Sequence, residues 1–236
     1  MYVRVALVLL VGGSVTSGAA AQASCEIAPV TVARWWGQFS VEEARLTLID
    51  CGYEPNLAAL EELSVLARPQ GVDRPEAPVA NPMPGFVAPG IARLDPQLPV
   101  RLQAIADRFP GRRIEIISGY RPRARRTSRH RLARALDVRV DGVSRAHLSD
   151  FLRTLPETGV GYYPNSAFTH VDVRERRYYW VDNSGPGERP AYDREPTDDV
   201  DRERREILAK ALEELGRIAE IEDGSGSVGD VDVDRE

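Results

Sequence analysis

The chain has 236 residues, of which 42% are hydrophobic and 28% charged, and its formal net charge is −5 at neutral pH. This mild acidity argues against a nucleic-acid partner, because such proteins present strongly basic surfaces. The charge is unevenly distributed. Arginines gather between Arg112 and Arg145, whereas acidic residues dominate after Glu188. We therefore expect a locally basic middle region and an acidic C-terminal region.

The first 23 residues have the pattern of a secretory signal peptide. Arg4 precedes the apolar run Val5–Val11, and small residues lead to an A-x-A cleavage site at Ala21–Ala23. The run is shorter than the roughly 20 residues that span a bilayer, and no later segment is long or apolar enough to do so. The sequence predicts an exported protein, periplasmic or associated with the cell envelope, without a transmembrane segment.

The chain has two cysteines, Cys25 and Cys51. In an oxidising compartment, two thiols in a short N-terminal stretch usually pair, which predicts a disulfide between them. The alternative is a lipoprotein in which Cys25 is the modified first residue. That interpretation requires a leucine-like residue three positions earlier, where this chain has Gln22.

Residues 24–68 are predicted to form a helical N-terminal segment. Ser40 and Glu43 have the spacing of a capping box before several apolar residues, which indicates a helix there. A second helix is expected at residues 56–66. Residues 69–97 are rich in proline and show no periodicity, so they are interpreted as a linker.

Residues 98–182 are predicted to form the core of the protein. Apolar positions recur at helical spacing from Pro99 to Phe109, and β-branched residues follow. The expected strands are 113–117, 135–140, 160–163 and 168–173, with a helix at 145–155. This order predicts an α+β fold with a small, mostly antiparallel sheet and flanking helices. Residues 183–221 are expected to be a charged linker and helix, and residues 222–236 a disordered acidic tail.

Two of the three histidines lie in segments that resemble metal sites. His130 precedes Asp137 by seven residues, and His170 lies two residues before Asp172. Catalytic zinc takes three nitrogen or oxygen ligands from the protein and keeps a position for water. His130, Asp137 and His170 would complete such a set. Spacing alone does not distinguish it from a hydrogen-bonded core histidine and an aspartate at a strand edge.

Three sequence blocks carry a resemblance to a known family. They are ISGYRP at 117–122, SRHRLARALD at 128–137, and GVGYYP through FTHVDV at 159–173, continuing to Trp180. Over residues 98–182 the chain resembles the zinc D-Ala-D-Ala carboxypeptidases and murein endopeptidases, which share their fold with hedgehog signalling domains. The resemblance implies a zinc cofactor held by His130, Asp137 and His170, and peptidoglycan stem peptides as substrate.

The chain departs from the family pattern in places. Ala133 replaces the usual glycine between the first two ligands, and if this position needs a positive φ, alanine costs about 1 kcal/mol. Arg125 and Arg126 stand where an asparagine is common. Many relatives place an acidic general base shortly before the last histidine, but residues 164–169 contain no acid.

Asp172 is the best remaining candidate for the general base. Its alternative role is to accept a hydrogen bond from a ligand imidazole and so orient it. Arg121 resembles the family arginine that binds a substrate carboxylate or the developing oxyanion. Ser118 and Tyr163 are further candidates for substrate binding. His147 and the tryptophans are interpreted as packing or surface residues.

These features predict a zinc metallopeptidase that hydrolyses peptide bonds in peptidoglycan. The sequence leaves open whether the bond is D,D or L,D, whether cleavage is terminal or internal, and what the oligomeric state is. The alternative function is a non-catalytic zinc-containing domain that binds the cell wall or a protein partner.

Overall fold

The computed structural model describes residues 25–193. The predicted signal peptide, the charged helix and the acidic tail lie outside these residues. The strands are β1 (Val30–Trp36), β2 (Ser40–Leu46), β3 (Phe86–Ala88), β4 (Ile91–Ala92), β5 (Ile114–Ser118), β6 (Ala135–Val140), β7 (Thr158–Tyr162), β8 (Thr169–Val173) and β9 (Tyr178–Val181). The helices are α1 (Leu57–Leu66), α2 (Gln97–Arg108) and α3 (Arg145–Leu152).

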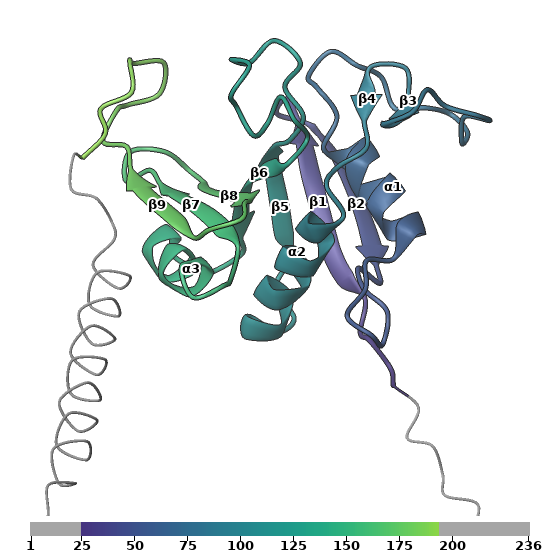
Figure 1. Ribbon diagram of the computed structural model, residues 1–236, viewed down its shortest axis with the longest axis horizontal. Coiled ribbons are helices and arrows are strands. Elements are labelled where there is room, and N and C mark those ends of the chain that lie inside the picture. Colours follow the sequence, from purple (N-terminus) through teal and green to yellow (C-terminus); the bar gives the residue numbers. More distant parts are fainter. Residues whose placement is uncertain (1–24, 194–236) are drawn as a thin grey trace, which may run out of the picture.

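Seven strands form one sheet in the order β2-β1-β5-β6-β8-β7-β9, and β3 and β4 form a separate hairpin (Figure 1). Neighbouring strands in the large sheet are antiparallel except β1 with β5 and β7 with β9. The expected α+β fold with a mostly antiparallel sheet is confirmed. The sheet is larger than expected and partly mixed, because β1, β2 and β9 extend the four predicted strands.

The predicted helix beginning at Ser40 is wrong, because residues 40–46 form β2. Helix propensity is a weak prior, and here it is overridden by antiparallel pairing with β1 along the full length of both strands. Glu42 on this strand forms an ion pair with Arg68 at 2.6 Å. The second predicted helix is present as α1, and the side chain of Asn56 caps its N-terminus.

The proline-rich segment 69–97 is more than a linker. It is mostly irregular, but it contains the β3–β4 hairpin, and Ile91 and Leu94 are fully buried in the hydrophobic core. Asp95 forms an ion pair with Arg134 at 2.9 Å, next to the predicted site. This segment therefore packs on the core and helps to position the loop that precedes β6.

Side chains alternate along the central strands, so the hydrophobic core lies on one face of the sheet and the site on the other. Leu136 and Val138 of β6 and Val171 of β8 belong to the same buried cluster as the apolar face of α2. Figure 1 shows α1 and α2 in front of the sheet. Because side chains of a strand alternate between its two faces, Asp137 and His170 lie on the opposite face from α2.

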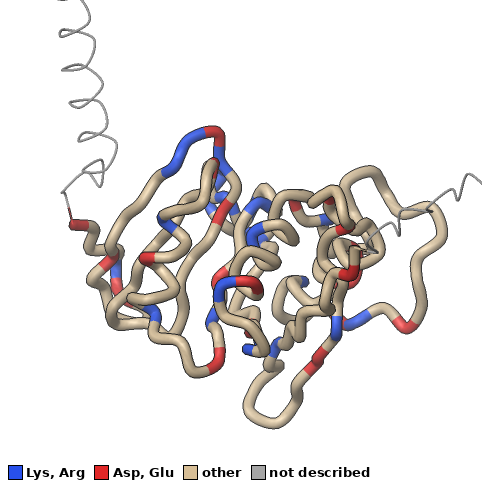
Figure 2. Tube along the Cα trace, turned by 90° about the horizontal axis from the view of Figure 1, so that it is seen from below, with Lys and Arg blue, Asp and Glu red and all other residues tan. Residues whose placement is uncertain are grey.

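The expected disulfide joins Cys25 to Cys51 and encloses the β1–β2 hairpin. Within residues 25–193, no helix combines the length and apolar character needed to cross a bilayer. Acidic and basic positions are interspersed along most of the described trace (Figure 2).

Candidate metal centre

A row of cross-strand partners builds the floor of the site. Asp137 on β6 lies directly opposite His170 on β8, and Ser118 on β5 pairs with Asp137 on the other side. The row continues from His170 to Gly161 on β7 and then to Trp180 on β9. Directly paired residues point to the same face of a sheet. The register therefore aligns residues from five strands on one face.

The first histidine reaches this row from the loop between β5 and β6. His130 is buried, and its Nδ1 lies 2.7 Å from the carbonyl oxygen of Gly119. Gly119 in turn packs against the C-terminal end of α1, where an added Cβ would lie 2.5 Å from the carbonyl oxygen of Ala67. The glycine of the SGYR block is thus required for close backbone approach, and its carbonyl orients His130.

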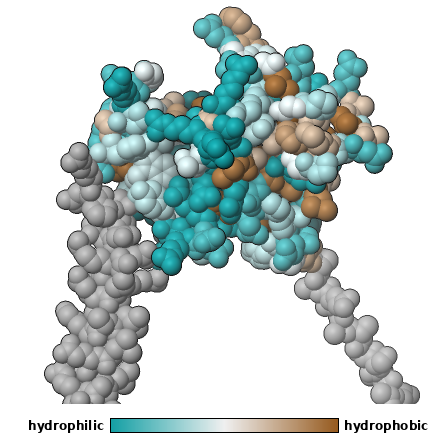
Figure 3. All heavy atoms as spheres, turned by 45° about the horizontal axis from the view of Figure 1, so that its top comes forward, coloured by the Kyte–Doolittle hydropathy of each residue, from teal (hydrophilic) through white to brown (hydrophobic). Residues whose placement is uncertain are grey.

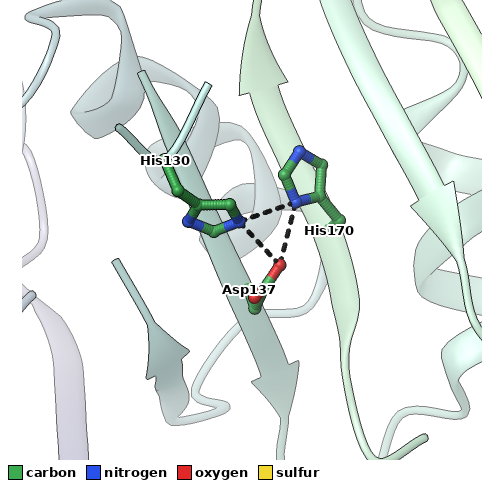
Figure 4. Close-up of side chains that lie close together, drawn as sticks. All are labelled: His130, Asp137 and His170. Carbon is green, nitrogen blue, oxygen red and sulfur yellow. Dashed lines mark hydrogen bonds and ion pairs between the residues drawn. The ribbon is translucent and has the colours of Figure 1, made fainter. Parts of the chain in front are cut away.

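The three predicted ligands converge (Figure 4). His130 Nε2 lies 3.0 Å from His170 Nδ1 and 3.2 Å from Asp137 Oδ1, and His170 Nδ1 lies 2.8 Å from Asp137 Oδ1. A tetrahedral metal with bonds of about 2.0–2.1 Å separates its ligand atoms by about 3.3 Å. Small outward shifts would therefore accommodate a metal ion. Within the described residues, this is the one group of three with metal-binding spacing.

Hydrogen bonds on the outer side of each ring explain why the cluster suits a cation. A carbonyl oxygen accepts only, so His130 Nδ1 must carry a hydrogen, and neutral His130 presents a bare Nε2 to the centre. His170 Nε2 donates to Asp172 Oδ2 at 3.0 Å, which leaves neutral His170 with a bare Nδ1 facing the same point. Two nitrogen lone pairs and a carboxylate oxygen repel one another unless a cation lies between them.

The electrostatics agree with this geometry. Burial alone raises the pKa of the Asp137 carboxyl, but attraction and hydrogen bonding from His130 and His170 outweigh burial and hold this pKa well below its usual range. Burial lowers the pKa of His170, whereas hydrogen bonds with Asp137 and Asp172 raise it by more. The net effect keeps Asp137 ionised and favours a proton on His170, so in the metal-free protein a proton between these residues takes the place of the cation.

Asp172 lies behind His170 and not beside the other two ligands. Its side chain is fully buried, and besides the bond to His170 it accepts hydrogen bonds from Arg174 Nε at 2.5 Å and Nη2 at 2.7 Å. An added Cβ at Gly159 would collide with both of these side chains. Both carboxylate oxygens are therefore engaged on the side of the imidazole that faces away from the centre.

Arg121 is at the edge of the centre. Its Nη2 lies 3.1 Å from Asp137 Oδ2, while its side chain remains 48% exposed, so the rest of the guanidinium fork is accessible. Ser118 is half-buried next to Asp137 in the cross-strand row, but it lines the neighbouring groove and not the cleft over the centre.

An aromatic wall lies on the opposite side. Trp180 packs beside His170 with ring centroids 5.1 Å apart, and its Nε1 donates to the Tyr163 hydroxyl at 3.2 Å. Gly161 between the two strands leaves room for Trp180 to lean over the site. Burial raises the pKa of Tyr163, so its hydroxyl stays protonated and can donate. His147 lies away from the site, where it packs edge-on against Phe109.

Ala133 adopts the left-handed conformation that the glycine of related sequences indicates. Its φ is 55°, and its carbonyl oxygen accepts a hydrogen bond from Asp95 N at 2.9 Å. Alanine tolerates this conformation at a cost of about 1 kcal/mol, so the departure from glycine preserves the turn that leads into β6.

A cleft of about 540 Å³ opens over the centre. Figure 3 brings the top of Figure 1 forward, and hydrophilic side chains are spread over this face. The cleft is also lined by residues that were not predicted to belong to the site, among them Arg174, Trp180 and Tyr192. Sequence reasoning missed these three as site residues. Arg174 directly follows the H-x-D-V block, which is a signal that could have identified it.

Comparison with protein families matches residues 88–180 to the family described as peptidoglycan L,D-endopeptidase MepK. The peptidoglycan L,D-endopeptidase MepK of Escherichia coli strain K12 is 31% identical over 78 residues, covering 28% of this chain and 43% of that protein. The probable peptidoglycan L,D-endopeptidase MepK of Haemophilus influenzae is 36% identical over 72 residues, covering 25% and 39%.

The chain spans less than half the length of these curated relatives. No solved structure gives a significant match. The matched segment includes all three sequence blocks and the entire His130, Asp137 and His170 cluster. The resemblance to the murein endopeptidases is therefore confirmed over residues 88–180.

Proposed function

We propose that this protein is a zinc-dependent peptidoglycan endopeptidase that cleaves bonds between L- and D-configured residues of stem peptides. The convergence of three hydrogen-free ligand atoms in one buried cluster is the observation that carries the proposal. The names of the relatives support the substrate and the type of bond. The predicted export to the periplasm or cell envelope would bring the protein to this substrate.

His130, Asp137 and His170 would hold the metal. Two imidazoles and one carboxylate are a common ligand set for catalytic zinc, which leaves one position for water or substrate. A zinc ion bound there supplies a Lewis acid that polarises the scissile carbonyl and lowers the pKa of water towards 7.

Protein side chains around this position would bind and orient the substrate. The free part of the Arg121 fork suits a peptide carboxylate or a developing oxyanion. Because the Tyr163 hydroxyl accepts from Trp180, its own hydrogen is available for the substrate. Asp172 and Arg174 would fix the His170 ring, which makes them positioning residues. This role fits Asp172 better than that of the general base.

One observation favours the alternative of a non-catalytic zinc domain. Among the described residues that line the cleft, Asp172 is the one carboxylate, and both of its oxygens are already engaged. A candidate general base with a free carboxylate is therefore absent from this part of the chain. The two functions differ in whether peptide bonds are broken.

Incubation of the zinc-loaded protein with purified peptidoglycan, followed by mass analysis of the products, tests the proposal. We expect new muropeptides from cleavage of L,D bonds, and about one zinc per chain in the purified protein. The double variant His130→Ala, His170→Ala should lose both zinc and activity. Full zinc in this variant would refute the ligand assignment. Full zinc in the unaltered protein without any product would favour the non-catalytic function.

A further inference from the structure

A second groove adjoins the metal cleft on the side of the N-terminal strands. This groove, called here the Arg34 groove, has a volume of about 780 Å³ and is lined by Arg34, Val72, Ile117, Tyr120 and Arg123, among others. It shares Arg121 and Ala124 with the metal cleft, so the two hollows meet at the beginning of the arginine-rich loop.

All charged residues of the described chain that line the groove are positively charged. Arg34, Arg121 and Arg123 line it, and no acidic residue does so among residues 25–193. The exposed guanidinium of Arg123 forms no ion pair within 4 Å there. A concave surface with positive charges and no acids attracts anions.

Arg34 gives the strongest indication of a ligand. Only 6% of this residue is exposed, and its Nη1 donates to the carbonyl oxygens of Leu66 at 2.8 Å and Arg68 at 2.6 Å, at the end of α1. Within residues 25–193, its Nε and Nη2 form no hydrogen bond. Arg34 therefore brings a buried guanidinium to the wall of the groove.

No carboxylate of the described part of the chain forms an ion pair with Arg34. Glu42, the nearest acid that influences it, pairs with Arg68 and Arg74. Arg34 itself stacks on Trp36, with its guanidinium carbon 4.0 Å from the ring centroid. Burial and the neighbouring Arg68 together lower the pKa of Arg34 to about 10, because Glu42 raises this pKa by less than Arg68 lowers it. Buried charges are normally paired, so a ligand anion would remove an energetic cost here.

The apolar part of the lining favours a peptide over a simple anion. Ile117 is 37% exposed, and Val72 and Tyr120 stand beside it in the groove wall. Carboxylates of a stem peptide would meet the guanidinium groups, and its aliphatic carbons would cover these side chains. Arg34 and Val72 lie outside residues 88–180, so similarity to the relatives does not cover this wall.

We propose that the Arg34 groove binds a carboxylate of a second stem peptide, so that cleft and groove together accept a cross-linked pair of peptide strands. This inference rests on the proposed endopeptidase function, because terminal cleavage requires only the metal cleft. It assigns to the N-terminal strands a role in substrate selection.

Direct binding tests the groove independently of catalysis. The ligand is the tetrapeptide L-Ala-γ-D-Glu-meso-diaminopimelyl-D-Ala, titrated by calorimetry into metal-free protein at low salt. Arg123→Gln and Arg34→Gln should each weaken binding about tenfold or more, as expected for a lost charge-assisted hydrogen bond. Arg126→Gln is the matched control, because Arg126 belongs to the same exposed loop but lines neither hollow.

Arg123 is exposed, so its variant remains informative if Arg34→Gln does not fold. Equal binding by wild type, Arg123→Gln and Arg126→Gln would overturn the proposal. Inorganic phosphate provides a second check, because competition as strong as that of the peptide would mean a simple anion site. Binding that requires the peptide and responds to Arg123 supports the proposal.

Activity then tests the link to the endopeptidase. With zinc-loaded protein, Arg123→Gln should lower kcat/KM about tenfold on a cross-linked muropeptide dimer and leave zinc content unchanged. If the unaltered protein cleaves nothing but binds the peptide as expected, the proposed function is wrong and the groove is still supported as a peptide-binding site. If it cleaves the dimer and Arg123→Gln has no effect on binding or cleavage, the groove proposal alone fails.

Discussion

Replacement of Asp172 by asparagine separates two possible roles of this carboxylate, which follows the last metal ligand by two residues. Three N–H groups point at this carboxylate, one from His170 and two from Arg174. Asparagine has one acceptor oxygen and an NH₂ group that donates, so at least one buried N–H must lose its acceptor.

The structure gives the expected magnitudes. An unsatisfied buried donor costs about 1–3 kcal/mol, and loss of the partner of Arg174 adds to this, although Arg174 is 22% exposed and partly solvated. We expect the metal-free variant to be less stable by about 2–3 kcal/mol, which lowers Tm by about 5–10 °C in a domain of this size. Because the His170 ring loses its orienting partner, zinc affinity should fall about 10–100-fold.

Competition with a chromogenic zinc chelator measures the affinity, and hydrolysis of muropeptides at saturating zinc measures the activity. Activity should recover largely when zinc saturates the site. Asp182→Asn is the matched control. Asp182 is also buried, and both of its hydrogen bonds, from Ser184 N and Ala191 N, are accepted by Oδ1, which asparagine retains. Unchanged zinc affinity in Asp172→Asn with a 10²–10⁴-fold loss of kcat would refute the positioning role and identify a general base.

Three further predictions concern other parts of the site and fold. Gly119→Ala should cost more than about 2 kcal/mol and weaken zinc binding, because the new methyl group collides with the backbone of Ala67; normal thermal stability would contradict the close approach. Arg121→Lys keeps the charge but loses the planar fork, so kcat/KM should fall while zinc content, measured by metal analysis, stays the same. Reduction of Cys25–Cys51 should destabilise the protein by about 3 kcal/mol in denaturant titrations, and no shift of the midpoint would exclude a constraining role for the disulfide.

The sequence predicted the central elements because their patterns are local. The β-branched strands of the middle region and the apolar face of α2 lie close to their expected bounds. The N-terminal strands were missed for opposite reasons. Residues 40–46 contain good helix formers, and only long-range pairing makes them a strand. Residues 30–36 have a strand-like composition of valines, threonine and tryptophans that could have identified β1.

The candidate ligands were predictable from their types and from the family pattern, but their surroundings depend on register. No spacing in the sequence indicates that Asp137 pairs with His170 across two strands. The same register brings Trp180 to the cleft, although its sequence context predicts a packing residue. Arg34 lies almost ninety residues before Arg121 in the chain, and only the order of strands in the sheet places both beside one groove.

The parallel pairing of β1 with β5 affects how the chain folds. β2 is an edge strand, so the β1–β2 hairpin has no other sheet neighbour until β5 exists. A two-stranded hairpin alone is marginally stable, and contacts between distant segments slow folding. During synthesis the N-terminal strands must therefore wait for residues 114–118. We expect the antiparallel β5–β8 region to order first, with the wall that carries Arg34 docking onto it as a late step.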